Sequence, residues 1–122
     1  MSFIARANKK GKYALVTHEG KFTKEEFEEA RSIAKIMLEK HHWNKLLVDL
    51  RGIVNRLPAE DKLYAMESNV KVLPHIKIGL VFPLELQEEV TFSDAVSAKH
   101  RVNLKSFVDY EQAVAWLTNK LT

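Results

Sequence analysis

The chain has 122 residues, of which 46% are hydrophobic and 29% charged, with a formal net charge of +3 and no cysteine. This length suits one domain around a single hydrophobic core, which we assign to residues 1–122. The absence of cysteine excludes disulfides and thiol catalysis and agrees with a cytoplasmic location, and no apolar run approaches the roughly 20 residues that cross a bilayer. Residues 1–12 lack the apolar core of a secretion signal.

The N-terminal segment predicts a β-hairpin. Short apolar stretches at Phe3–Ala5 and Tyr13–Thr17 flank a segment with turn composition, residues 8–11. Basic side chains surround this turn, and such a cluster can attract phosphates or an anionic membrane surface. We favour the simpler interpretation that they solvate the hairpin tip, and we expect no nucleic-acid partner because no aromatic residues are interleaved for base stacking. The basic residues are Arg6, Lys9, Lys10 and Lys12.

The next element is a long helix that runs to about His42. Thr23 can cap its N-terminus, Glu26 completes a T-x-x-E capping box, and Phe22 can pack on Phe27 as a staple. Residues at helical spacing then predict one face toward the core. These residues are Phe27, Ala30, Ala34, Met37, Leu38 and His41.

The segment from Lys45 to Pro58, KLLVDLRGIVNRLP, predicts a buried strand, a loop and the start of a helix. The run 45–50 does not alternate between polar and apolar residues, as is typical of a parallel strand covered on both faces. Pro58 suits the first turn of the following helix, for which we predict an apolar stripe of Leu63, Met66 and Val70. The carboxyl end of such a strand is where open α/β sheets bind ligands and partners.

The remaining elements complete an α/β pattern. Lys77–Phe82 and Leu104–Val108 predict two short strands at or near the centre of the sheet, with a less regular helix at 91–100 between them. Asp109 caps a closing helix with a broad apolar face of Ala113, Val114, Trp116, Leu117 and Leu121. The fold class is therefore α/β: one mixed sheet of about five strands, an antiparallel hairpin followed by βα units, flanked on both faces by about four helices.

Two segments resemble a known family. KLLVDLRGI is similar to the strand ending in Asp-Leu-x-Gly, and KSFVDYEQAVAWL to the closing segment, of the SpoIIAA-like division of the STAS superfamily. In the anti-sigma-factor antagonists of this superfamily, a serine at the start of the second helix is phosphorylated and its charge breaks binding to a partner kinase. Here that segment falls on Leu57, Pro58 and Ala59, none of which accepts a phosphate. The resemblance thus implies the fold without the phosphoacceptor.

Two functions remain open. In the first, the protein is a non-catalytic protein-interaction or signalling module that presents the loop after the third strand to another protein. The helix N-terminus and arginines of this loop also suit an acidic partner or a small anion. The partner-binding residues would be Asp49, Arg51, Gly52, Asn55, Arg56 and Leu57.

In the second, the protein carries a small ligand or lipid, because some SpoIIAA-like proteins are structurally similar to lipid-binding CRAL-TRIO domains. A carrier of this kind needs an apolar pocket. Apolar residues are plentiful near the strand ends, although each of them also suits an ordinary core. The candidate lining is Val54, Leu57, Leu63, Phe82, Leu84, Leu86 and Phe92.

We expect no enzymatic activity, metal or cofactor. His41 and His42 are adjacent and point in different directions on a helix, so we expect them to cap its C-terminal carbonyls. His18, His75 and His100 lack metal-ligand spacing. Asp49 suits a structural role, accepting hydrogen bonds from amides of the following loop, better than that of a general base.

The oligomeric state is open. Trp43, at the end of the first helix, and the aromatic residues of the closing helix are candidate contacts of a homodimer. The short first strand, followed by lysines, discourages edge-to-edge pairing.

Overall fold

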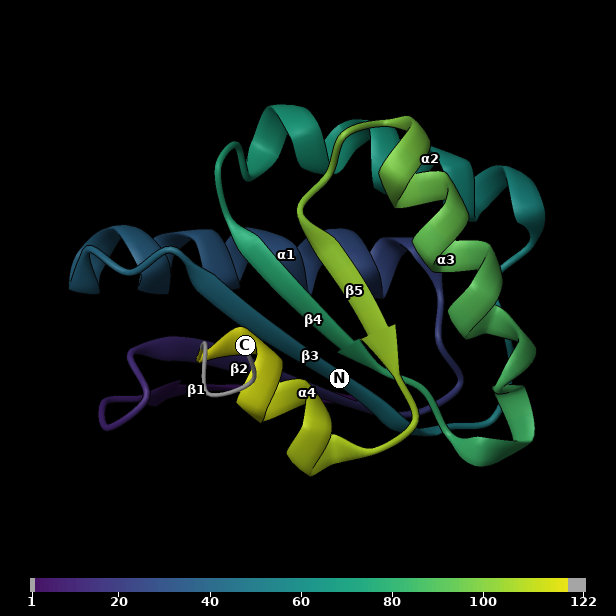
Figure 1. Cartoon of the computed structure of the whole chain (residues 1–122), viewed down its shortest axis with the longest axis horizontal. Helices are drawn as coiled ribbons and strands as arrows, with labels where there is room; N and C mark the ends of the chain where they lie inside the picture. The colour runs from purple at the N-terminus through teal and green to yellow at the C-terminus, as the bar shows by residue number, and fades with distance from the viewer. Residues whose placement is uncertain (1, 119–122) are drawn as a thin grey trace.

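A five-stranded mixed sheet in the order β1-β2-β3-β4-β5 forms the centre of the protein (Figure 1). The computed structural model describes residues 2–118. The β1–β2 hairpin is antiparallel and every later pairing is parallel, as the sequence predicts. The final strand is an edge strand, so the expectation of a central position is wrong for it. The strands are β1 (Phe3–Asn8), β2 (Tyr13–Gly20), β3 (Lys45–Ile53), β4 (Lys77–Val81) and β5 (Leu104–Phe107).

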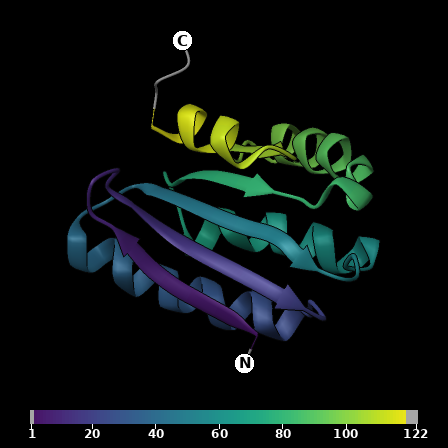
Figure 2. The same ribbon diagram turned by 90° about the horizontal axis from the view of Figure 1, so that it is seen from below.

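Helices cover both faces of the sheet. The helices that precede β5 pack against one apolar cluster. The helix that follows β5 packs against another cluster on the opposite face, as Figure 2 shows for α1 and α4. None of the helices within residues 2–118 is long and apolar enough to cross a membrane. Leu121, predicted to extend the closing helix's apolar face, lies outside the described residues. The helices are α1 (Lys24–His41), α2 (Ala59–Val72), the short 3-10 helix η1 (Leu84–Leu86), α3 (Glu88–Lys99) and α4 (Tyr110–Leu117).

β3 is the strand buried on both faces. Leu46, Val48 and Leu50 belong to the cluster beneath the first three helices, whereas Leu47 contributes to the cluster beneath α4. A strand that faces helices on both sides gains from apolar residues at every position, which explains the missing alternation. The strand's carboxyl end is thereby fixed beside the connections that lead into α2 and α3.

α1 begins and ends by two different devices. The Thr23 hydroxyl accepts a hydrogen bond from the Glu26 amide at 3.1 Å, which confirms the predicted cap. The Glu26 carboxylate accepts hydrogen bonds from Ser2 and His18. At the C-terminus His42 adopts a left-handed φ of 57° and its backbone amide donates to Glu39, while the His41 ring stacks on Trp43. The backbone, not the histidine rings as predicted, therefore makes the cap.

α2 presents a different face to the core from the one predicted. Leu63 and Val70 are 39% and 46% exposed, whereas Ala65, Met66 and Asn69 are buried. The helix makes its main close contacts with α1 and α3 rather than with the sheet. Its inner face therefore carries small and polar residues that an apolar-stripe prediction cannot detect.

α3 turns polar residues inward as well. Glu89, Ser93 and Ser97, spaced four residues apart, are its buried positions. The Ser97 hydroxyl bonds the Leu104 and Asp94 carbonyl oxygens, and the Asp94 carboxylate accepts from the Ser106 amide at 2.8 Å. Hydrogen bonds to β5 thus hold α3 in place, which explains the poor apolar periodicity of this segment.

Candidate functional site

Near the carboxyl end of β3, the Asp49 carboxylate is hydrogen-bonded to its neighbour Arg51. Asp49 is buried, and its oxygens accept from the Arg51 amide at 3.1 Å and from the Arg51 guanidinium twice at 2.9 Å. The guanidinium also lies 4.5 Å from the centre of the Tyr110 ring. Hydrogen bonding to Asp49 raises the pKa of Arg51. Asp49 accepts from the Arg51 amide as predicted, but Arg51 still belongs to β3, so the loop begins after Ile53 and not at Arg51.

Gly52 and Asn55 serve the close approach of two chain segments. A Cβ at Gly52 would lie 3.1 Å from the His18 carbonyl oxygen, so only glycine fits without a shift. The Asn55 side chain accepts from the Phe22 amide at 2.7 Å and donates to the Phe22 carbonyl oxygen at 2.9 Å. Gly52 therefore allows β3 to approach β2, whereas Asn55 joins the β3–α2 connection to the β2–α1 connection, and these contacts occupy the Asn55 side chain internally.

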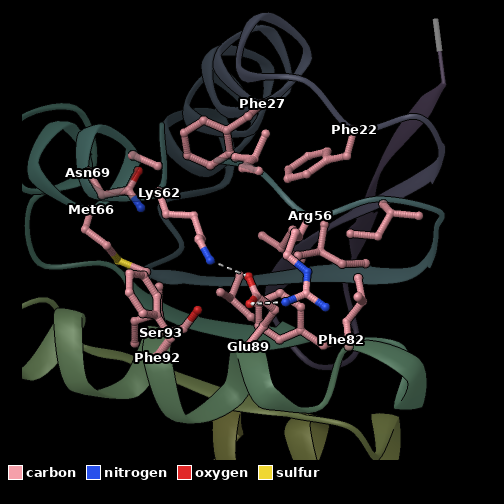
Figure 3. A pocket seen from close by; sticks show the side chains of 18 residues that line it. Phe22, Phe27, Arg56, Lys62, Met66, Asn69, Phe82, Glu89, Phe92 and Ser93 are labelled. Carbon is pink, nitrogen blue, oxygen red and sulfur yellow. Dashed lines mark hydrogen bonds and ion pairs between the residues drawn. The ribbon is translucent and has the colours of Figure 1, made fainter. Parts of the chain in front are cut away.

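Arg56 and Leu57 belong to a cavity, and Figure 3 shows its lining. The cavity has a volume of about 70 Å³ and lies between the sheet, α1, α2 and α3. The Arg56 side chain is half exposed, so the cavity meets solvent beside it. The apolar lining is Phe22, Phe27, Val48, Leu50, Ile53, Leu57, Ala65, Met66, Leu80, Phe82, Leu86, Phe92 and Leu104.

The predicted pocket residues divide into two groups. Leu57, Phe82, Leu86 and Phe92 line the cavity. Val54 and Leu84 do not, because they are 77% and 64% exposed in the connections after β3 and β4. Leu63 lies on the outer side of α2 and does not line it either. Sequence position alone placed all of them near the strand ends, but only the fold shows which side chains turn inward.

Three charged residues form a cluster on one wall of the cavity (Figure 3). Lys62 donates to the buried Glu89 carboxylate at 2.8 Å, and Arg56 pairs with Glu88 and lies 3.8 Å from Glu89. The Lys62 ammonium also sits 4.3 Å from the centre of the Phe92 ring. A buried carboxylate needs such partners to compensate for lost hydration. The sequence analysis did not select Lys62 or Glu89. One signal was present for Glu89, because it is an acidic residue just before the irregular helix predicted at 91–100.

Two further polar side chains reach the cavity from opposite walls. Ser93 is 4% exposed and Asn69 is 6% exposed. The Asn69 oxygen accepts from the Arg31 guanidinium at 2.9 Å, so its amide nitrogen points elsewhere. Among the described residues, neither that nitrogen nor the Ser93 hydroxyl has a hydrogen-bond partner. The cavity therefore combines an apolar body with unoccupied donors.

A second, smaller cavity of about 30 Å³ lies between α1, α2 and the sheet. It shares four lining residues with the first: Phe27, Val48, Asn69 and Leu80. The two cavities are therefore neighbours.

The histidines do not form a metal site. Within residues 2–118 no group of three His, Asp, Glu or Cys side chains could hold a metal ion. His18 is 1% exposed and its Nδ1 lies 2.9 Å from Glu26 Oε2. Burial lowers the pKa of His18 despite the nearby carboxylate. In Glu26, hydrogen bonds from Ser2 and His18 outweigh the effect of burial and lower the pKa of the carboxyl.

Comparison with solved structures identifies the fold. An uncharacterised protein of the DUF3478 family from Shewanella loihica PV-4, which has a SpoIIAA-like fold, matches with a TM-score of 0.63 at 18% sequence identity. The match covers 94% of this chain and 91% of that chain. The chain has a SpoIIAA-like fold. A scan against models of known protein families finds no match, and neither does a search of curated proteins.

The SpoIIAA-like fold agrees with the resemblance seen in KLLVDLRGI and KSFVDYEQAVAWL. The similar protein is itself uncharacterised, so the match brings no activity with it. A fold hosts many functions, and the function must be argued from the site.

Proposed function

We propose that this protein is a non-catalytic binding domain that holds a small apolar ligand, bearing one hydrogen-bond acceptor, between the sheet and α2. The observation that carries the proposal is the apolar cavity of about 70 Å³ with Lys62, Asn69 and Ser93 on its walls. Ligand sites in proteins share this combination of an apolar lining and a few convergent polar groups.

The polar groups favour an acceptor on the ligand. Lys62 offers ammonium hydrogens, Asn69 an amide nitrogen and Ser93 a hydroxyl. An ester, amide or carboxylate oxygen would satisfy them, whereas a purely apolar ligand would leave them without partners at a free-energy cost. A negatively charged group on the ligand is tolerated best beside Arg56. The ion pair between Arg56 and Glu88 is exposed, so breaking it costs little free energy.

The arrangement of α2 favours adaptation to the ligand's size. The cavity alone accommodates only a short segment of a molecule, since an engineered cavity of roughly 150 Å³ is needed for benzene. α2 begins at Pro58 without a side-chain cap and makes few close contacts with the sheet. A small outward movement of this helix, with Phe27 turning aside, would extend the space into the second cavity.

Titration with straight-chain alcohols and carboxylates, observed by protein NMR, tests this function. We expect shifts for residues lining the cavity, and native mass spectrometry of gently purified protein to show a bound mass that is lost on denaturation. Ala65→Leu fills the cavity from α2 and should abolish these shifts without lowering the melting temperature. Ala95→Leu makes the same change at an exposed position of α3 and is the matched control.

Two outcomes would contradict the binding-domain proposal. One is the absence of any cavity shift with every compound, together with an unmodified mass from several expression hosts. The other is equal binding by the Ala65→Leu and Ala95→Leu variants, which would place the ligand elsewhere.

A protein-interaction module is the second candidate, and one observation favours it. Val54 and Leu84 are exposed apolar residues in the connections that follow the adjacent strands β3 and β4. Against it, Asp49, Asn55 and Arg56 of the proposed interaction loop are already paired within the chain. A partner bound by the wild type but lost in Val54→Glu, with the cavity variants unaffected, would favour the interaction module.

A further inference from the structure

The amino ends of the parallel strands carry a surface of unusual charge. β2, β3, β4 and β5 run in the same direction, so the connections that precede them lie at the same end of these strands, from the lower left to the top in Figure 1. Together with the last residues of the helices and the first residues of the strands that they join, these connections are residues 9–12, 40–45, 71–77 and 99–103. We call this surface the basic end.

None of these four connections contains an aspartate or glutamate. The basic cluster at the hairpin turn is therefore one part of a larger surface that all four connections share. The turn and the β3 connection together line one shallow depression, through Lys10, Lys12 and Lys45. The basic residues are Lys9, Lys10, Lys12, Lys40, His41, His42, Lys45, Lys71, His75, Lys77, Lys99, His100 and Arg101.

Helix dipoles explain only part of this pattern. Basic residues are favourable near the C-termini of α1, α2 and α3, which end here. The hairpin turn adjoins the C-terminal end of α4, because Lys10 and Lys12 line one depression with Val114 and Thr118, so its lysines are also near a helix end. At the adjoining strand starts, Lys45 and Lys77 are direct neighbours in the β3–β4 register, although like charges side by side in a sheet are unfavourable. Burial, and then the Lys45 charge, lower the pKa of Lys77.

The backbone at the basic end is also held in an unfavourable conformation. Each of the four connections contains one residue with positive φ: Lys12 at 58°, His42 at 57°, His75 at 65° and Arg101 at 57°. Glycine adopts this conformation at least cost, and an ordinary L-residue does so with a penalty. In every connection a basic side chain occupies the place where glycine would be more stable. At Lys12 and Arg101 a positive charge is therefore present at the expense of stability.

An aromatic and apolar depression lies beside these charges. Its volume is about 570 Å³, between the ends of α1 and α2, and its lining includes Trp43, Pro74 and Ile76, with three basic side chains and one acidic one around them: Lys35, Lys71, His42 and Glu39. Tryptophan and lysine together are typical of the interface between a membrane and water. A nucleic acid would need several open aromatic faces for its bases, whereas Trp43 is already stacked on His41 at 4.2 Å.

We infer that the basic end is a docking surface for an anionic phospholipid bilayer. The charges are spread over four connections along the width of the sheet, which suits a flat anionic surface better than a single phosphate. Trp43 and Ile76 then lie at the level of the headgroups. Each lysine close to such a surface adds roughly a fivefold gain in affinity. This inference concerns a surface away from the cavity and does not depend on the proposed ligand.

Vesicle flotation of the full chain tests the inference. The probes are phosphatidylcholine vesicles with and without about 30 mol % phosphatidylserine, at low and at physiological salt. We expect binding to the anionic vesicles only, weakened by salt because the charges are exposed. Lys10→Glu/Lys71→Glu should lower the affinity by about tenfold or more. Lys21→Glu/Lys24→Glu makes the same charge change at the other end of the sheet and should leave vesicle binding nearly intact.

A second pair of substitutions separates binding from folding. Lys12→Gly/Arg101→Gly removes two charges at positions of positive φ, so we expect weaker vesicle binding together with an unchanged or raised melting temperature. Absence of binding to anionic vesicles at low salt would overturn the inference. So would an equal loss in both lysine-to-glutamate pairs. Tighter binding of a DNA duplex or of polyglutamate than of the vesicles, measured with the same protein, would assign the basic end to another partner.

Discussion

The two ends of the parallel strands differ in charge, backbone conformation and packing. The connections at the amino ends are basic, contain no acidic residue and include a left-handed residue in each case. At the carboxyl ends, acidic residues of the adjoining elements pair with the arginines: Asp49 of β3 with Arg51, and Glu88 and Glu89 of α3 with Arg56. Charged side chains at the carboxyl ends are thus paired within the chain, whereas most basic side chains at the amino ends are exposed.

This difference assigns separate roles to the two ends. At the carboxyl ends the paired charges and aromatic side chains surround a cavity, so these connections are part of the core. At the amino ends the side chains are mostly exposed and the apolar lining is shallow. Substitutions at the carboxyl ends should therefore affect stability strongly, whereas those at the amino ends should affect it little or even improve it.

The largest expected effect is at Leu57, which is 8% exposed beside the cavity. Leu57→Ala should lower the free energy of unfolding by about 2–4 kcal/mol, because it removes buried methyl groups and enlarges a space that is already present. Val54→Ala, three residues away but 77% exposed, should change it by less than about 0.5 kcal/mol. Urea denaturation measures both, and equal losses would contradict the inward placement of Leu57.

The next effect is at Glu89, whose side chain is 6% exposed. Glu89→Ala should cost about 2–3 kcal/mol, because Lys62 loses its partner in a largely apolar environment while Arg56 can still turn to solvent. Lys62→Met/Glu89→Leu should recover most of the loss. Glu88→Ala, at the adjacent exposed position, is the control and should leave the denaturation curve unchanged.

A smaller expected effect is a loss of stability at acidic pH that depends on His18. Because the pKa of His18 is lowered in the folded protein, the neutral form is favoured there, and stability must fall as the pH drops below the ordinary value of 6.5. Glu26, whose pKa is also lowered, adds a loss in the same direction at more acidic pH. His18→Gln should flatten the melting temperature between pH 7 and 5, whereas the exposed His75→Gln should not. A steeper profile in His18→Gln would contradict this account.

The smallest expected effect is a gain in stability, at the amino ends of the parallel strands. His75→Gly should raise the free energy of unfolding by up to about 1 kcal/mol, because it relieves a left-handed conformation in an exposed connection. Asn44→Gly changes a position without positive φ in the neighbouring connection 40–45, and it should lower the free energy of unfolding slightly. A loss of stability in both variants would show that the His75 side chain makes a stabilising contribution.

The order and type of the elements could be predicted from the sequence because local signals agreed. The caps at Thr23 and Asp109 and the apolar run of β3 are each readable within a few residues. The edge position of β5 could not be read, since its short apolar pattern resembles that of a central strand. Right-handed crossovers define which faces the helices cover, but not where the last strand is added.

The candidate site was only partly predictable, because its polar contacts join distant residues. Lys62 and Glu89 are 27 positions apart, and Arg31 and Asn69 are 38 apart. Each looks like a solvated surface residue in a helix when its partner is unknown. Leu63 and Val70 therefore seemed the better inner face of α2, although hydrogen bonding turns Asn69 inward instead. Apolar periodicity fails where ion pairs and hydrogen bonds orient a helix.

Arg31 has a consequence for the timing of ligand exchange. Its guanidinium is buried between α1 and α2, donates to Ser68 and Asn69, and leaves its Nε without a partner among the described residues. Burial lowers the pKa of Arg31, so its charged form is disfavoured while the helices are together. When α2 moves outward, the Arg31 guanidinium becomes hydrated. The free energy of this hydration offsets part of the loss from the broken apolar contacts. The residence time of a bound molecule should therefore depend on how often α2 separates from α1, and an arginine far from the cavity mouth would regulate it.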